Sequence, residues 1–84
     1  MNLIHLRQQV DGIDKSILQL IAKRFLLVQE IRPLKTAVAD VHREESLHQL
    51  WKEHAATLGL SETFIAELLD IVLAESRRLQ TKIA

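Results

Sequence analysis

The sequence predicts an all-α fold with one long N-terminal helix and two shorter helices. Hydrophobic residues make up 48% of the 84-residue chain, whereas Gly occurs twice and Pro once, so helix-breaking residues are scarce. The apolar residues recur at steps of three and four, which is the spacing of one helix face. No linker or internal repeat interrupts this pattern, and we assign residues 1–84 to a single domain.

The first helix is predicted at about residues 3–35. Its apolar spacing begins at Leu3 and meets no Pro before Pro33, which opposes a helical Arg32; a kink or an end there would displace Lys35. A helix of this length is about 45 Å long, which exceeds the diameter of a compact domain of this size. Part of it must pack outside its own chain, so we expect at least a dimer.

The second helix is predicted at about residues 41–58 and the third at about residues 62–82. Asp40 stands where an N-cap residue would start the second helix, and Gly59 is a typical helix stop. Ser61 follows at once as the N-cap of the third helix. The order of these signals gives three helices with short connections.

Three cations, Arg7, Arg24 and Lys35, interrupt the apolar stripe of the first helix. An unpaired buried charge costs several kcal/mol, so each cation needs water, an acidic partner or an anionic ligand. In the simplest interpretation, Arg7 and Lys35 reach water from the helix ends while Arg24 pairs with a carboxylate. The alternative is a pocket for a small molecule with two negative charges.

The other helices favour the pocket. Ser76 and Gln80 are four residues apart and share the apolar face of the third helix, so two neutral hydrogen-bonding groups point to the core. Arg43 and Glu44 lie in the first turn of the second helix. Polar side chains that converge from three helices are typical of a binding site inside a helix bundle.

Several function classes have little support. Eleven basic and eleven acidic residues cancel, so no overall field favours nucleic acid or a membrane surface. No run is long enough to span a membrane, and the N-terminus lacks the apolar core of a signal peptide, so we expect a cytoplasmic protein. His42, His48 and His54 recur every six residues, off any single helix face, and we expect neither a metal nor a cofactor.

The pocket also lacks a nucleophile with an activating base. The pocket can still bind anions, orient a polar group and stabilise charge that develops on an oxygen. The candidate polar residues also follow one another along the chain in a distinctive order. They lie in Leu6-Arg7-x-x-Val10-Asp11-x-Ile13-Asp14, Leu20-Ile21-Ala22-Lys23-Arg24, Lys35, Asp40-x-x-Arg43-Glu44, and Glu75-Ser76 with Gln80. This set, which covers nearly the whole chain, resembles the all-helical chorismate mutase family.

The resemblance implies an intertwined antiparallel dimer of three-helix protomers that converts chorismate to prephenate, the branch-point step toward phenylalanine and tyrosine. It implies that Arg24 and the partner's Arg7 hold the two substrate carboxylates. Arg43 would support this cationic wall through Asp40 or the ligand. No residue would form a covalent bond or need to transfer a proton.

The same resemblance implies the remaining roles. Lys35 and Gln80 would donate hydrogen bonds to the ether oxygen whose bond breaks. Glu44 would accept a hydrogen bond from the ring hydroxyl, and Ser76 would contact a carboxylate. The chemistry suits the site, since an intramolecular rearrangement needs positioning and electrostatic stabilisation alone.

Alternatives stay open on the same scaffold. An isochorismate-pyruvate lyase or an aminodeoxychorismate mutase would use a similar pocket, although Glu44 favours the ordinary mutase. A non-catalytic helical binding module is the alternative from another class, and it would leave the residues at Lys35 and Gln80 free to vary. The sequence leaves open whether the domain stands alone or belongs to a bifunctional chain.

The spacing of the cations requires two copies of the chain. Arg7 and Arg24 are 17 residues apart, about 25 Å along a helix, which is too far to grip one small molecule. If two long helices run antiparallel, Arg7 of one approaches the Arg24–Lys35 region of the other. The stripe of each copy then contributes one half to each of two symmetry-related sites, which the two copies share.

Overall fold

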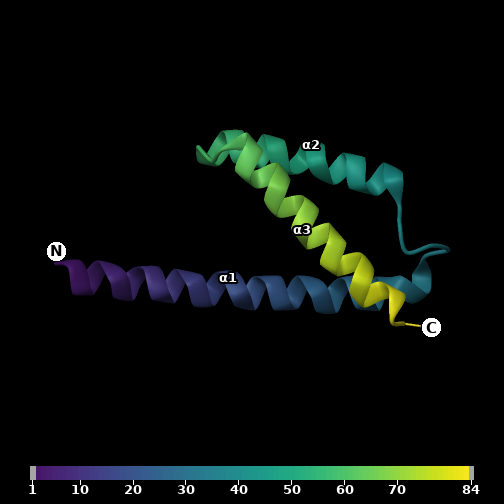
Figure 1. The fold of residues 1–84 in the computed structure, drawn as a ribbon, viewed down its shortest axis with the longest axis horizontal. Helices are drawn as coiled ribbons and strands as arrows, with labels where there is room; N and C mark the ends of the chain where they lie inside the picture. Colours follow the sequence, from purple (N-terminus) through teal and green to yellow (C-terminus); the bar gives the residue numbers. More distant parts are fainter. Residues whose placement is uncertain (1, 84) are drawn as a thin grey trace.

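The computed structural model describes residues 2–83 as three α-helices and one short 3-10 helix (Figure 1). In chain order they are α1 (Leu3–Ile31), η1 (Arg32–Leu34), α2 (Val41–Leu58) and α3 (Glu62–Thr81). Residues 2–83 contain no strand, which confirms the predicted all-α fold. Within the same range, no helix is both long and apolar enough to cross a membrane.

The predicted helix caps of α2 and α3 are confirmed. The Asp40 carboxylate accepts a hydrogen bond from the Arg43 backbone N–H at 3.0 Å, and the Ser61 hydroxyl accepts one from the Phe64 N–H at 3.2 Å. Gly59 ends α2 with a φ of 70°, a left-handed conformation that side chains disfavour. These local signals fix the ends of the α2–α3 hairpin.

The end of α1 lies four residues before the predicted one, so the prediction of a helix through Lys35 is wrong. The helix ends at Ile31, and Lys35 has extended backbone angles of φ −109° and ψ 147°. The cause is Pro33, whose nitrogen carries no proton and cannot donate to the Gln29 carbonyl. The Arg32 N–H donates to that carbonyl instead, and the chain continues as the tighter 3-10 helix η1.

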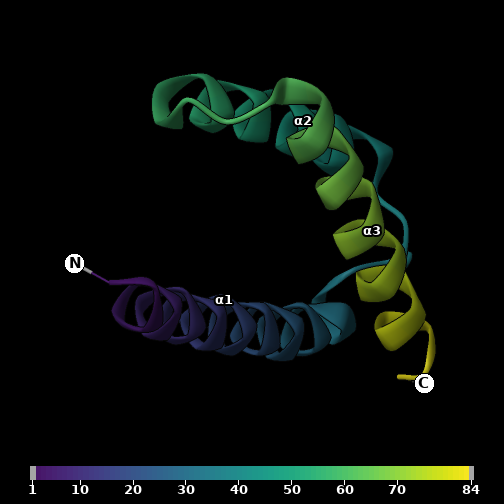
Figure 2. The same ribbon diagram turned by 60° about the vertical axis from the view of Figure 1, so that its left-hand side comes forward.

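The core lies between α2 and α3. Leu47, Leu69 and Leu73 form a buried cluster, and Trp51 packs against it. The C-terminal part of α1 contacts α3, whereas its N-terminal half extends away from both other helices in both views (Figures 1 and 2). No residue of α1 is buried within the described chain, so the stripe that the sequence predicts as buried is open in a single copy.

His48 links α2 to α3 outside this core. One ring nitrogen, Nδ1, lies 2.8 Å from the Glu44 backbone oxygen, and the other, Nε2, lies 2.9 Å from the Asp70 carboxylate. Both partners accept hydrogen bonds, so the imidazolium, which carries a proton on each nitrogen, satisfies both. The hydrogen bond with Asp70, and then that with the Glu44 carbonyl, raise the pKa of His48 above its ordinary value.

We therefore expect His48→Ala to lower the free energy of unfolding at about pH 5.5 more than at about pH 9. Because the folded-state pKa is raised, the stabilisation is fully present below the unfolded-state pKa and is lost as the pH rises through the folded-state value. Both side chains of the His48–Asp70 pair are exposed, so the difference should stay below about 1 kcal/mol. Urea unfolding followed by the fluorescence of Trp51, the single Trp, measures it.

The matched variant is Asp70→Asn, which keeps the size of the side chain and removes its charge. It should lose the same pH-dependent part of the stability, because the neutral amide no longer favours the imidazolium. Equal losses at both pH values in either variant would contradict a protonated bridge.

Candidate active site

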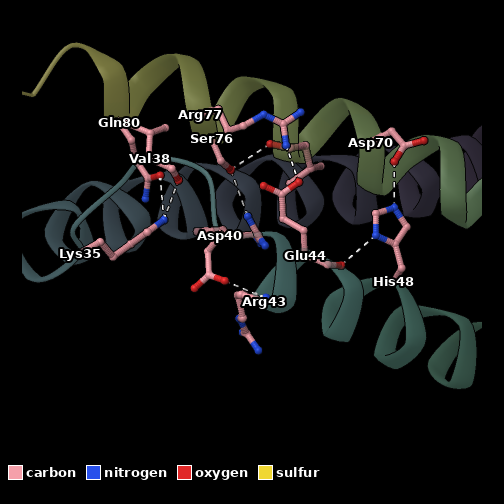
Figure 3. A network of polar contacts seen from close by, with 12 residues as sticks. Lys35, Val38, Asp40, Arg43, Glu44, His48, Asp70, Ser76, Arg77 and Gln80 are labelled. Carbon is pink, nitrogen blue, oxygen red and sulfur yellow. Dashed lines mark hydrogen bonds and ion pairs between the residues drawn. The ribbon is translucent and has the colours of Figure 1, made fainter.

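A cavity of about 320 Å³ lies where the end of α1, the 35–40 connection, the start of α2 and the end of α3 meet. Its volume is at the lower end of the range for small-molecule sites. Seven of the eight polar residues that the sequence singles out line it: Arg24, Lys35, Asp40, Arg43, Glu44, Ser76 and Gln80. Figure 3 shows the polar contacts around this cavity and labels these residues except Arg24.

The eighth residue, Arg7, lies outside the cavity. It is exposed on the N-terminal half of α1, and the 17 residues that separate it from Arg24 correspond to about 25 Å of helix. A single chain therefore does not bring Arg7 to the other seven residues.

Lys35 and Gln80 lie side by side at one end of the cavity (Figure 3). The Lys35 ammonium donates to the Val38 backbone oxygen at 2.8 Å and to Gln80 Oε1 at 3.3 Å, while Gln80 Nε2 donates to the Val28 oxygen at 2.7 Å. An ammonium has three protons and an amide nitrogen has two, so each group keeps one N–H for a ligand. Although Pro33 takes Lys35 off the helix, its side chain still lines the cavity.

The Arg24 guanidinium donates a hydrogen bond to a neutral side chain. Its Nη1 donates to the Ser76 hydroxyl at 3.2 Å, and that hydroxyl donates in turn to the Val72 backbone oxygen at 2.8 Å. Since the Ser76 proton goes to Val72, the buried hydroxyl orients Arg24 and accepts from it. Burial, and then repulsion by Arg43, lower the pKa of Arg24 from its ordinary value. Two neighbouring cations of this kind favour an anionic ligand between them.

Glu44 faces the cavity from the first turn of α2 and pairs with Arg77 of α3, a residue that sequence reasoning missed. Arg77 Nη1 donates to Glu44 Oε1 at 2.5 Å. The signal was available in the sequence: a step of four residues relates Leu73 to Arg77, as it relates Ser76 to Gln80. Arg77 therefore borders the same face of α3, and it too lines the cavity.

The lining chemistry suits binding and electrostatic stabilisation. Four cations (Arg24, Lys35, Arg43, Arg77) and two carboxylates (Asp40, Glu44) line the cavity, which leaves an excess of two positive charges. The described lining contains no His, and its one hydroxyl already donates to Val72, so it offers no activated nucleophile. Across residues 2–83, no three His, Asp or Glu side chains cluster in a way that could hold a metal ion.

Comparison with known proteins finds curated relatives of this chain. The chain is 35% identical over 75 residues to a T-protein of Enterobacter agglomerans, covering 84% of this chain and 20% of that protein. It is 30% identical over 86 residues to a bifunctional chorismate mutase/prephenate dehydratase of Buchnera aphidicola, covering 98% of this chain and 22% of that protein. The chain thus spans about a fifth of the length of these relatives. No solved structure gives a significant match.

A family model supplies the assignment. The model for chorismate mutase type II matches residues 6–81, a range that contains all three helices but for the first residues of α1 and includes all seven polar lining residues that the sequence singles out. The printed name of the Buchnera aphidicola relative agrees with this match. The chain belongs to the chorismate mutase type II family.

Proposed function

We propose that this chain catalyses the rearrangement of chorismate to prephenate. The observation that carries the proposal is the excess of two positive charges in the cavity, set beside two free N–H donors on Lys35 and Gln80. Chorismate is a dianion with two carboxylates and an ether oxygen, so it presents the groups that such a lining complements. The family membership supports the same reaction.

The rearrangement breaks the bond between the ether oxygen and the ring and forms a carbon–carbon bond within the same molecule. No proton, electron or leaving group passes to the protein. The site accelerates the reaction by holding the enolpyruvyl arm over the ring and by stabilising negative charge on the ether oxygen as its bond lengthens. Lys35 and Gln80 are the donors for that oxygen, and the 3.3 Å hydrogen bond from Lys35 Nζ to Gln80 Oε1 keeps the two side chains together at one end of the cavity.

Arg24 is the proposed partner of one substrate carboxylate. Its guanidinium has a neutral partner in Ser76, which leaves its charge for the ligand, and Arg43 adds a second cation nearby. Asp40 caps α2 through the Arg43 backbone N–H and so fixes the position of Arg43 in the first turn of the helix. Glu44 accepts from the ring hydroxyl through the oxygen that Arg77 does not use.

The second carboxylate needs a second copy of the chain. Exposed large apolar side chains run along α1, among them Leu3 (59% exposed), Val10 (53%) and Ile17 (48%). An exposed apolar stripe of this length marks a protein interface. In an antiparallel homodimer the two α1 helices cover each other, and the partner's Arg7 enters the cavity. A cytoplasmic location, expected from the sequence, suits an enzyme of small-molecule biosynthesis.

The direct test is incubation of the purified protein with chorismate and, separately, with isochorismate. We expect prephenate from chorismate and no salicylate plus pyruvate from isochorismate, with products separated by liquid chromatography. Salicylate and pyruvate would instead assign the lyase reaction. Absence of turnover on both substrates, with the ligand-free protein folded, would leave a binding module and contradict the proposed function.

A further inference from the structure

Arg77 is held against Glu44 by the tertiary fold. The pair joins α3 to α2 across 33 residues of chain, and its side chains are 40% and 25% exposed (Figure 3). The next residue, Arg78, makes a contrast: it pairs with Glu75 of its own helix, and it is not among the residues that line the cavity. Two adjacent arginines, each paired with one glutamate, thus differ in whether they face the cavity.

The pair leaves half of the Glu44 carboxylate for a ligand. Among the contacts of residues 2–83, the carboxylate accepts one hydrogen bond, from Arg77 to Oε1. Oε2 therefore keeps its lone pairs while the bond to Oε1 fixes the plane of the carboxylate. A donor on the ligand meets an acceptor that is already oriented.

The pair also removes most of the net charge at this corner of the cavity. A hydroxyl that donates to Oε2 carries no net charge, so the nearby guanidinium does not repel it. An ammonium at the same place is attracted by Glu44 and repelled by Arg77, and at this partial burial the two effects largely cancel. Without Arg77, the Glu44 carboxylate would face the ligand without its ion-pair partner, which favours an ammonium more than the intact pair does.

We propose that Arg77 is a positioning and specificity-determining residue, which orients Glu44 and selects a neutral hydroxyl over an ammonium on the substrate ring. The inference rests on the proposed function, since Glu44 must face the ring substituent. It separates chorismate from 4-amino-4-deoxychorismate, which carries an amine where chorismate carries the hydroxyl.

The test compares kcat/KM for these two substrates in the wild type, Arg77→Leu, Arg77→Lys and the matched control Arg78→Leu. We expect Arg77→Leu to lower kcat/KM for chorismate by about tenfold. The ratio of chorismate to amine turnover should fall by about tenfold as well. Arg77→Lys keeps the charge and should hold the ratio within about threefold of the wild type.

The ratio is the decisive measurement, because both substrates are assayed on one preparation and any loss of folded protein cancels. An unchanged ratio in Arg77→Leu would overturn the inference, and so would an equal shift in Arg78→Leu. If the wild type converts chorismate and the Arg77 variants keep the wild-type ratio of chorismate to amine turnover, this inference alone is contradicted. A wild type that converts neither substrate contradicts the proposed function and the inference together.

Discussion

Replacement of Lys35 by alanine is expected to lower kcat for chorismate by about a hundredfold or more while the protein stays folded. The described hydrogen bonds of Lys35 go to neutral acceptors, the Val38 carbonyl and Gln80 Oε1, so its full charge is available to the ether oxygen. That charge counts most in the transition state, where the carbon–oxygen bond is partly broken. Initial rates at saturating chorismate measure the loss.

Gln80→Ala should cost a similar factor, because it removes the second donor to the same oxygen. Lys82→Ala is the control, since Lys82 is exposed two residues further along and does not line the cavity. Near-normal turnover by Lys35→Ala or Gln80→Ala would refute the role of that residue, provided that circular dichroism shows the helical content of the wild type.

Arg7→Ala is expected to lower kcat/KM by about a hundredfold, although Arg7 lies outside the cavity of its own chain. The reason is that one substrate carboxylate loses its guanidinium in both sites of the dimer. Lys15→Ala is the matched control, because Lys15 is an exposed cation on the same helix but off the apolar stripe. Steady-state kinetics with chorismate measure both variants, and a near-normal Arg7→Ala would show that the partner does not complete the site.

Much of the fold is predictable because its signals are local. The side chains of Asp40 and Ser61 each accept from a backbone N–H three residues on, and Gly59 acts through its own backbone, so their effect can be read from the sequence. The inward positions of Ser76 and Gln80 follow from helical spacing alone, and they are 6% and 4% exposed. Periodicity also selects the face of α3 that borders the cavity.

The rest depends on contacts between distant segments. Pro33 opposes a longer helix, but whether α1 kinks or ends there depends on how the chain beyond it turns toward α2. The Arg77–Glu44 pair spans 33 residues and needs the crossing of α2 and α3 to be known. The stripe of α1 shows the opposite limit: its periodicity is that of a buried face, yet a single chain leaves no residue of α1 buried.

The central claim is that each active site combines the cavity of one chain with Arg7 of another. The most direct measurement mixes Arg7→Ala with Arg24→Ala, by co-expression or by joint refolding, and assays chorismate turnover. Each variant alone has both sites damaged, whereas a mixed dimer concentrates both lesions in one site and leaves the other intact. Equal mixing should restore about a quarter of wild-type activity. No recovery above the separate variants, with mixed dimers shown to form, would contradict the shared site.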